Sequence, residues 1–401
     1  MKILVTCQYY KPEPFRISDI CEELASRGHE VTVVCGQPNY PMGEIYDGYS
    51  GRQKREEILN GVKVHRCFNF GRKRGMFHRT LNYLSYYRSS GRYAKKIKDE
   101  FDVVFVNQLS PVLMANAAIK YKKKHNKKIV LYCLDLWPES LVFGGIKRGS
   151  VLYRILHNIS KRIYKNADEI LITSKSFETY FKNEFGISCT HYLPQYAESM
   201  FSPESCSKIP DGKIDLMFAG NVGTAQSVET IIRAAEKTRN IPNLRWHIVG
   251  DGSEFGKIKS LAEELELTSV IFHGRQPIEK MPEFYSMADA MLVTMQANPI
   301  ISMTLPGKVQ SYMAAGKPII GAINGETPKI IKEAGCGLCC DAEDSDALAK
   351  LAVEFMNSDG NVFGKNAYDY YCSFFKKHIF LDKLEATLSQ NTLCKTQDQH
   401  N

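Results

Sequence analysis

The sequence predicts an α/β protein built from two Rossmann-like, doubly wound domains in tandem. Short apolar segments alternate with segments of helical periodicity, this alternation stops in a proline- and serine-rich stretch at 194–213, and it then starts again. A chain of 401 residues is also longer than a single hydrophobic core usually supports. Because short strands and helices alternate, we expect a parallel sheet covered on both faces in each domain.

The first half of the chain opens with an apolar run at 2–7, which predicts a core strand. Residues 17–24 carry apolar side chains at helical spacing, and Gly28 marks the end of this helix. Further apolar runs predict strands at 31–35, 102–106, 128–134 and 169–174.

The second half repeats the pattern. Apolar runs predict strands at 214–220, 244–250, 269–274, 289–295 and 317–323. Helical periodicity predicts helices at 226–239, 255–266, 279–287, 308–315 and 344–356. We therefore expect an N-terminal domain over 1–195, a C-terminal domain over 196–360, a helical segment over 361–389 and a disordered polar tail over 390–401.

Composition excludes several classes of protein. No segment approaches the roughly 20 apolar residues that span a bilayer, and the N-terminal run continues into proline as a strand and not as a secretory signal. The twelve cysteines are scattered, mostly within apolar runs, which is typical of free thiols in a reducing cytosol. Cys336 and Cys339 form an isolated C-x-x-C, and we expect no metal site there. Phosphate-loop, zinc-protease and catalytic-triad signatures are absent from the sequence.

Charge is distributed unevenly along the chain. Residues 1–195 contain 32 Lys and Arg against 18 Asp and Glu, whereas the remainder contains 20 against 26. Fourteen basic residues lie between Arg52 and Lys98, opposed there by Glu56 and Glu57 alone. This pattern indicates a polyanionic partner for the first half: a membrane surface, a lipid phosphate or a nucleic acid. For the second basic run, at 120–128, a solvated helix face is an equal alternative.

Three loops of the second half follow strands or open helices, where a parallel sheet binds its ligand. In the first loop, 220–223, glycines allow a backbone to approach a phosphate, and the helix that follows offers free N–H groups. The second loop, 250–253, again allows positive φ at a strand end. In the third loop, 306–308, a lysine stands in the first turn of a helix, where the helix dipole disfavours a cation unless an anion binds there too. The predicted donor-binding residues of these loops are Gly220, Asn221, Gly223, Gln226, Gly250, Asp251, Gly252, Pro306, Gly307 and Ser311, together with Lys308.

Two loops of the first half also follow predicted strands. Tyr9 belongs to the segment after the first strand, and Asp135, Trp137 and Glu139 belong to the segment after the strand at 128–134. Trp137 has a flat face suited to a sugar or a lipid, and packing in the core is the alternative. We expect Tyr9, Trp137 and Glu139 to serve the acceptor.

Together these loops resemble those of the GT-B glycosyltransferases, within the large retaining family 4, over nearly the whole chain. The resemblance is strongest to bacterial O-antigen and capsule enzymes of the N-acetylfucosaminyltransferase type. RGHEV and MAAGKP are widespread in the family, whereas PNYP, DLWPES and LPQYAE are narrower. The motifs that carry the resemblance lie at 26–49, 108–111, 135–140, 192–198, 218–231, 248–252, 279–289 and 306–320.

The resemblance implies retaining transfer of a sugar, an N-acetylated deoxy-aminosugar, from a nucleoside diphosphate without a metal or another cofactor. By analogy the nucleotide is UDP, and the last helix returns to the N-terminal domain. Family members carry two glutamates eight residues apart, and Met303 and Ser311 stand at those positions. The family's arginine and lysine in the first loop align with Asn221 and Gln226. Candidates for the catalytic residues are therefore Lys308 and Arg275 for the missing positive charge, and Asp135 for orienting the donor sugar.

Acceptors of this subgroup are polyprenyl-diphosphate-linked sugars at the cytoplasmic face of the inner membrane. Residues 72–98 mix apolar and basic side chains, as does a helix that lies in an anionic membrane interface. Arg72, Arg74 and Arg79 are the predicted membrane contacts, and an internal helix packed on its domain is the alternative. We thus expect a cytoplasmic enzyme bound peripherally to the membrane, with no nucleic-acid partner.

Two other functions remain open at this point. A sugar-nucleotide 2-epimerase also uses two facing Rossmann-like units, but the basic and aromatic segment 72–98 argues against it. A non-catalytic, glycosyltransferase-like partner subunit is conceivable because the two family glutamates are absent.

Overall fold

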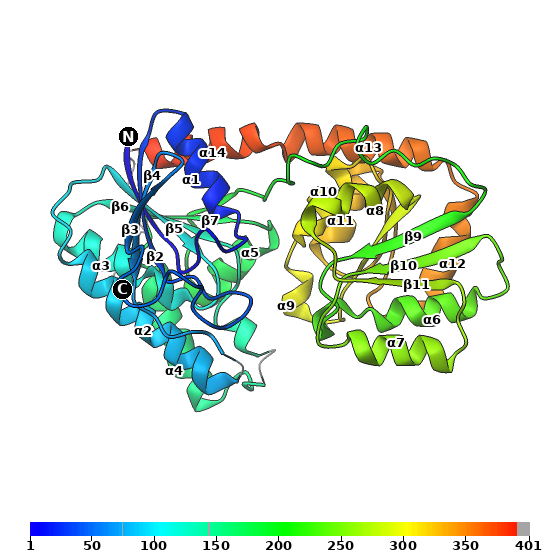
Figure 1. The fold of residues 1–401 in the computed structure, drawn as a ribbon, viewed down its shortest axis with the longest axis horizontal. Coiled ribbons are helices and arrows are strands. Elements are labelled where there is room, and N and C mark those ends of the chain that lie inside the picture. Colours follow the sequence, from blue (N-terminus) through cyan, green and yellow to red (C-terminus); the bar gives the residue numbers. More distant parts are fainter. Residues whose placement is uncertain (74, 143–144, 391–401) are drawn as a thin grey trace. The chain divides into compact units, whose positions relative to one another are not determined.

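The computed structural model describes residues 1–73, 75–142 and 145–390 (Figure 1). The chain divides into two compact units. Unit 1 contains residues 1–173 and 177–193 together with the described residues from Leu381, and unit 2 contains residues 174–176 and 194–380. Each unit is an α/β structure around one largely parallel sheet, which confirms the predicted fold class.

Unit 1 contains an eight-stranded sheet with the order β3-β4-β2-β1-β5-β6-β7-β8. Its strands are β1 (Lys2–Thr6), β2 (Glu30–Gly36), β3 (Glu56–Leu59), β4 (Val62–Cys67), β5 (Val103–Gln108), β6 (Lys128–Cys133), β7 (Glu169–Ile172) and β8 (Thr190–Tyr192). Its helices are α1 (Ile17–Ser26), α2 (Met76–Ala94), η1 (Val112–Ala115), α3 (Asn116–His125), η2 (Glu139–Leu141), α4 (Val151–Tyr164), α5 (Ser176–Tyr180), the π-helical turn η3 (Phe181–Phe185) and α14 (Lys377–Ser389).

The central strands of unit 1 are mainly apolar and largely buried, as expected where helices cover both faces of the sheet. Every residue of β5 is buried, as is every residue of β7. The edge differs from the prediction, since β3 pairs with β4 in an antiparallel sense. β3 lies at the edge of the sheet and alternates exposed with half-buried side chains, so it lacks the apolar run on which the strand prediction relied.

Unit 2 contains a six-stranded sheet with the order β11-β10-β9-β12-β13-β14. Its strands are β9 (Ile214–Ala219), β10 (Leu244–Val249), β11 (Val270–Gly274), β12 (Ala290–Thr294), β13 (Ile319–Ala322) and β14 (Gly337–Cys340). Its helices are η4 (Thr224–Gln226), α6 (Glu229–Lys237), α7 (Phe255–Glu264), η5 (Ile278–Lys280), α8 (Met281–Met287), α9 (Pro299–Ser302), α10 (Gly307–Ala314), α11 (Glu326–Ala334), α12 (Ser345–Met356) and α13 (Gly360–Phe374).

Two apolar cores cover the two faces of the sheet in unit 2. Alternate residues of β9 divide between them: Leu216 and Phe218 belong to the core beneath α6, α7 and α12, and Met217 and Ala219 to the core beneath α10, α11 and α13. The order of the strands reverses between β9 and β12. Parallel sheets of this type bind ligands beyond the carboxyl ends of their strands at such a reversal.

The segment 361–389 is helical, as expected. It forms two helices, and residues up to Phe380 belong to unit 2. α13 packs closely on the end of α10, because a Cβ on Gly364 would lie 2.4 Å from the carbonyl oxygen of Gly316. α14 lies beside α1 in unit 1, where Arg27 pairs with Glu385 at 2.6 Å (Figure 1). The expected tail lies almost wholly outside the described residues.

Candidate functional site

The first two glycine loops of unit 2 lie against each other at the carboxyl ends of β9 and β10. A Cβ on Gly250 would lie only 1.8 Å from the carbonyl oxygen of Gly220, and one on Gly252 would lie 2.4 Å from that of Val222. Gly220 and Gly250 also have φ of +143° and +137°, which side chains rarely adopt. Both glycines are therefore required by the backbone, and the sequence-predicted residues of these loops form one surface.

Backbone hydrogen bonds extend the ladder of the sheet into these loops. Gly220 N–H donates to the carbonyl of Val249 at 2.9 Å, and Val222 N–H donates to that of Asp251 at 3.0 Å. The chain then turns into η4 after Gly223. The result is a hydrogen-bonded backbone platform beyond the strand ends, of the kind that can bind a phosphate through its N–H groups.

Lys308 lies under this platform. Its Nζ is buried, and it has no hydrogen-bond partner among the residues that the structure describes. The ammonium group lies 3.8 Å from the centroid of the Phe218 ring, and a Cβ placed on Gly220 would be 3.0 Å from Nζ. Burial lowers the pKa of Lys308 to about 7. Lys308 therefore brings the third loop into contact with the first.

The third loop leads into α10. Pro306 is the N-cap residue of this helix and provides no side-chain capping hydrogen bond, so the first N–H groups of the helix have no side-chain acceptor at the cap. A Cβ on Gly307 would meet nothing within 4 Å, so space for a ligand is open there. Ser311, one turn further on, is buried and donates through Oγ to Oε2 of Glu198 at 3.2 Å.

The remaining predicted donor residues pair with one another. Asn221 Nδ2 donates to Gln226 Oε1 at 3.1 Å. Arg275 is exposed, and its Nε lies 3.9 Å from Asp251 Oδ2, so the structure brings this arginine to the second loop. The sequence analysis missed Phe218 and Glu198. Phe218 carries no polar group to mark it, and Glu198 lies in the linker, although its motif LPQYAE was noted.

Residues after β1 organise the N-terminal unit. Tyr9 is buried and stacks on Phe15 with a centroid distance of 4.8 Å. Glu13 accepts hydrogen bonds from three backbone N–H groups, those of Tyr10, Asn39 and Tyr40, at 2.8–3.2 Å. Glu13 therefore holds the segment with the PNYP motif in place, and the buried ring of Tyr9 supports that arrangement instead of presenting itself to an acceptor.

The segment after β6 also contributes to the packing of unit 1. Trp137 is only 3% exposed, which agrees with core packing and does not support the expected sugar-binding face. Glu139 is fully buried, and its Oε1 accepts from Tyr153 at 2.6 Å and from Tyr180 at 3.2 Å. Asp135 accepts from Ser110 N–H at 3.2 Å, and burial raises its pKa. Trp137 and Glu139 thus stabilise this unit and are not available to an acceptor.

The basic segment forms α2. An ordinary packed helix turns its apolar side chains inward, whereas α2 has polar side chains facing inward and apolar ones exposed. Its inward face carries hydrogen-bonded polar groups: Asn82 accepts from Gln8 at 2.7 Å, and Tyr86 donates to the Cys7 carbonyl at 2.7 Å. Its outward face carries Phe77, 75% exposed, and Leu84, 44% exposed. The exposed apolar residues are therefore not needed for the core.

The three predicted arginines of this segment lie differently. Arg79 is exposed in the first turn of α2. Arg72 is partly buried, with its guanidinium 5.8 Å from the ring centroid of Tyr83, and so it contributes to packing. Arg74 lies outside the described residues.

A second helix, α4, also combines exposed apolar side chains with a basic sequence. α4 exposes Val151, Leu152 and Ile155, each by more than half. Residues 140–167 contain six basic residues and no acidic one. Both α2 and α4 contact η1, so the two helices are neighbours in unit 1. α4 was not among the predicted membrane contacts, although its basic residues and its periodicity can be read from the sequence.

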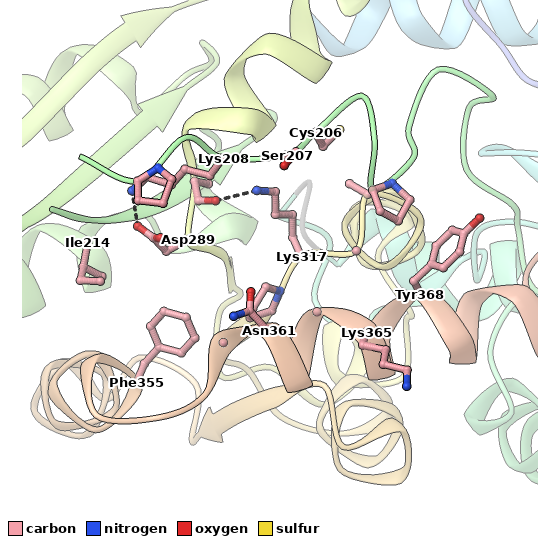
Figure 2. A pocket seen from close by; sticks show the side chains of 18 of the residues that line it. Cys206, Ser207, Lys208, Ile214, Asp289, Lys317, Phe355, Asn361, Lys365 and Tyr368 are labelled. Carbon is pink, nitrogen blue, oxygen red and sulfur yellow. Dashed lines mark hydrogen bonds and ion pairs between the residues drawn. The ribbon is translucent and has the colours of Figure 1, made fainter. Parts of the chain in front are cut away.

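The structure also has a cavity of about 690 Å³ in unit 2 (Figure 2). It lies at the amino ends of the strands, where Ile214 begins β9 and Asp289 precedes β12. Lys317 donates to the carbonyl of Ala288 at 2.7 Å, and Lys208 is paired with Asp289. Because it lies at the opposite edge of the sheet from the glycine loops, this cavity does not form part of the candidate site.

Among the residues that the structure describes, no group of three or more His, Cys, Asp or Glu side chains could hold a metal ion. Cys336 and Cys339 are free thiols, and burial raises the pKa of each to about 12. No helix within the described ranges is both long and apolar enough to span a membrane.

Comparisons with known proteins agree with the two-unit fold. Residues 16–194 match the family described as Glycosyltransferase Family 4, and residues 205–370 match the one described as Glycosyl transferases group 1. WbjE of Pseudomonas aeruginosa, a probable glycosyltransferase, is 28% identical over 271 residues, which are 65% of this chain and 67% of WbjE. WcaI of Escherichia coli, a putative colanic acid biosynthesis glycosyltransferase, is 25% identical. The match covers 79% of this chain and 82% of the WcaI chain. HepE of Anabaena, solved in complex with UDP, has the same fold, with a TM-score of 0.70 and 15% identity over 97% of this chain and all of HepE.

Proposed function

This chain is a glycosyltransferase with the GT-B fold, and we propose that it transfers a sugar from a UDP-linked donor to a polyprenyl-diphosphate-linked glycan with retention of anomeric configuration. The transferred sugar in this proposal is an N-acetylated deoxy-aminosugar, and the product is a cell-surface polysaccharide such as O-antigen or capsule. The relatives support a role in polysaccharide synthesis, because WcaI is described as an enzyme of colanic acid biosynthesis.

One observation supports the proposed donor site: a buried amine with no hydrogen-bond partner among the described residues lies beside two glycine loops. Gly250 lets the second loop pack against the Gly220 carbonyl, and a Cβ on Gly220 would lie 3.0 Å from Lys308 Nζ. The N-terminus of α10 adds N–H groups and the positive end of a helix dipole. A diphosphate provides the negative charge that this arrangement lacks. UDP is the favoured nucleotide because HepE binds it on the same fold.

The chemistry follows from this charge. Transfer breaks the bond between the anomeric carbon of the sugar and the oxygen of the diphosphate, so negative charge develops on that oxygen. A protonated Lys308 and the amides of the loops stabilise this charge in a site sheltered from water. The acceptor hydroxyl forms the new bond to the anomeric carbon, and its proton passes to the departing diphosphate. Arg275, which is exposed beside the second loop, can add positive charge once a donor is bound.

The acceptor side of the proposal depends on unit 1. α2 and α4 expose Phe77, Leu84 and Leu152 beside basic side chains, which suits a helix pair lying on an anionic lipid surface. Each basic residue near such a surface contributes about 1 kcal/mol of attraction. A peripheral enzyme on the cytoplasmic face would meet polyprenyl-linked acceptors there.

A nucleotide-release assay tests the function. The protein is incubated with a panel of UDP- and GDP-sugars, with and without a polyprenyl-diphosphate sugar. Acceptor-dependent release of UDP, with a retained glycosidic bond in the product, is the expected result. Epimerised donor without transfer would instead indicate a sugar-nucleotide 2-epimerase. Nucleotide binding with neither reaction would indicate a non-catalytic partner subunit.

A further inference from the structure

The Lys308 amine is in an unusual state for a charged group. Its Nζ is buried and, among the described residues, donates no hydrogen bond and forms no ion pair. Its neighbours are an aromatic ring, Phe218, at 3.8 Å and the backbone of Gly220. An ammonium removed from water without a partner is strongly disfavoured, so an amine at such a place tends to lose its proton.

The surrounding elements do not supply a compensating charge. The end of β9 and the first loop, residues 218–223, contain no ionisable side chain. In the second loop Asp251 faces Arg275. On α10 the other titratable group is Tyr312, whose hydroxyl donates to the carbonyl of Ala219, and Glu198 from the linker accepts from Ser311.

The pKa of Lys308 agrees with this geometry. Burial alone lowers it, and no neighbouring carboxylate raises it again. A bound diphosphate would place negative charge beside Nζ and favour the charged form. The folded protein therefore has an amine whose protonation depends on whether an anion occupies the loop.

We propose that Lys308 is mostly uncharged at pH 8 while the site is empty and takes up a proton when a nucleoside diphosphate binds, so that donor binding is coupled to proton uptake. This inference rests on the proposed donor site and adds a pH dependence to it. By linkage, the affinity for the nucleotide falls as pH rises above about 7, because the proton needed by the complex becomes scarcer.

Calorimetric titration with UDP at pH 8 tests the proposal. The terminal phosphate of UDP loses its second proton near pH 6. At pH 8 UDP is therefore already deprotonated and contributes few protons to the measured exchange. Titrations in buffers of different ionisation enthalpy measure the protons exchanged. We expect uptake of nearly one proton per UDP bound, and a dissociation constant that rises up to tenfold from pH 7.5 to 8.5. Uridine, which lacks phosphates, should bind without uptake.

Variants assign the proton to its residue. Lys308→Arg remains charged throughout this range, so it should bind UDP with no proton uptake and little pH dependence. Lys308→Met should bind more weakly, also without uptake. Lys350→Met, at an exposed lysine on α12, should match the parent protein. UDP binding by the parent that is independent of the buffer, or uptake that persists in both Lys308 variants, would overturn the proposal. Absence of UDP binding by the parent would instead reject the donor site on which the proposal depends.

Discussion

Ser311 on α10 donates a hydrogen bond to Glu198 of the linker, with 3.2 Å between Oγ and Oε2. Ser311 stands at the position of the second of the two family glutamates, and the family resemblance implies that this glutamate binds the nucleotide ribose. In this chain a carboxylate reaches that position from a segment more than 100 residues away in sequence. Glu198 is therefore our candidate for the group that accepts hydrogen bonds from the ribose.

Replacing this carboxylate should weaken nucleotide binding through the ribose. Hydrogen bonds to a charged group contribute about 1.5–3 kcal/mol, so Glu198→Gln should weaken UDP binding at least tenfold. Calorimetry should also show that 2′-deoxy-UDP binds the parent and the variant nearly alike. Glu204→Gln, at an exposed glutamate of the same linker, is the matched control. Equal loss for UDP and 2′-deoxy-UDP would argue against a contact with the ribose hydroxyl.

Lys308→Ala should slow sugar transfer strongly. Removing one donor that stabilises developing negative charge lowers turnover by about 10²–10³-fold. Steady-state rates with saturating donor and acceptor measure this, and circular dichroism checks the fold. Lys350→Ala on α12 is the control and should leave turnover unchanged. A Lys308→Ala protein with the turnover of the parent would remove this lysine from the mechanism.

Gly250→Ala should damage the donor platform. The new Cβ would lie 1.8 Å from the Gly220 carbonyl, at a φ of +137°, so the two loops must separate. We expect loss of UDP binding and a destabilisation of more than about 1 kcal/mol, seen as a lower thermal midpoint. Gly256→Ala is a matched control in α7, where a Cβ meets nothing within 4 Å. That substitution should be neutral or stabilise by up to about 1 kcal/mol.

The exposed apolar residues of α2 and α4 should mediate membrane binding. Full burial of one large apolar side chain contributes about 1.5–3 kcal/mol, so Phe77→Ser with Leu152→Ser should reduce co-sedimentation with anionic liposomes more than tenfold. Binding of the parent should weaken as salt rises, since the basic residues act through screened charge. Val353→Ser on α12 of unit 2 is the control. Equal binding of the parent to neutral liposomes at high salt would contradict electrostatic docking.

Asp215 should stabilise unit 2 in a pH-dependent way. Its buried carboxylate accepts from Lys208 at 2.7 Å and from His247 at 2.8 Å, and Arg245 also pairs with it. Burial alone would raise its pKa, but these partners outweigh burial and hold the pKa well below its ordinary value of 3.8. Asp215→Asn leaves the cations without their shared partner and should lower the free energy of unfolding by about 3–5 kcal/mol.

The sign of the pH effect follows from that lowered pKa. The stabilisation by Asp215 is complete above the unfolded pKa and is lost as pH falls below it, so the parent should lose stability between pH 5 and 3 more steeply than Asp215→Asn. Urea titrations in a Trp137→Phe background report on unit 2, because Trp246 is then the sole tryptophan. Asp211→Asn, at an exposed partner of Arg245, should change little. Parallel pH profiles for the parent and Asp215→Asn would contradict this role.

Local patterns in the sequence were sufficient for most of the fold. Apolar runs such as 214–220 predicted most core strands to within one or two residues, because strands buried on both faces are mainly apolar. The same reasoning missed the β3-β4 edge of the sheet, where charged residues interrupt the apolar pattern, and the break between α13 and α14. Both depend on contacts with distant segments, which a local pattern does not contain.

The candidate site also has features that local sequence predicts and features that depend on distant contacts. The glycine loops and Lys308 were identified from the sequence, since glycine after a strand and lysine at the start of a helix are unusual locally. Trp137 and Glu139 were assigned to the acceptor because of their place after β6, yet both are buried. Burial depends on what packs over a residue, and those partners come from other parts of the chain.

By itself the sequence determined that this protein has two α/β units, glycine loops after strands of the second unit and a basic first half, because periodicity, glycine placement and charge are properties of neighbouring residues. Only the tertiary structure decided that Lys308 Nζ is buried beside Gly220 with no hydrogen-bond partner in the described part of the chain, and that Glu198 supplies a carboxylate to Ser311. Solvation and pairing of a charge depend on groups brought together from distant segments, and folding alone brings them together.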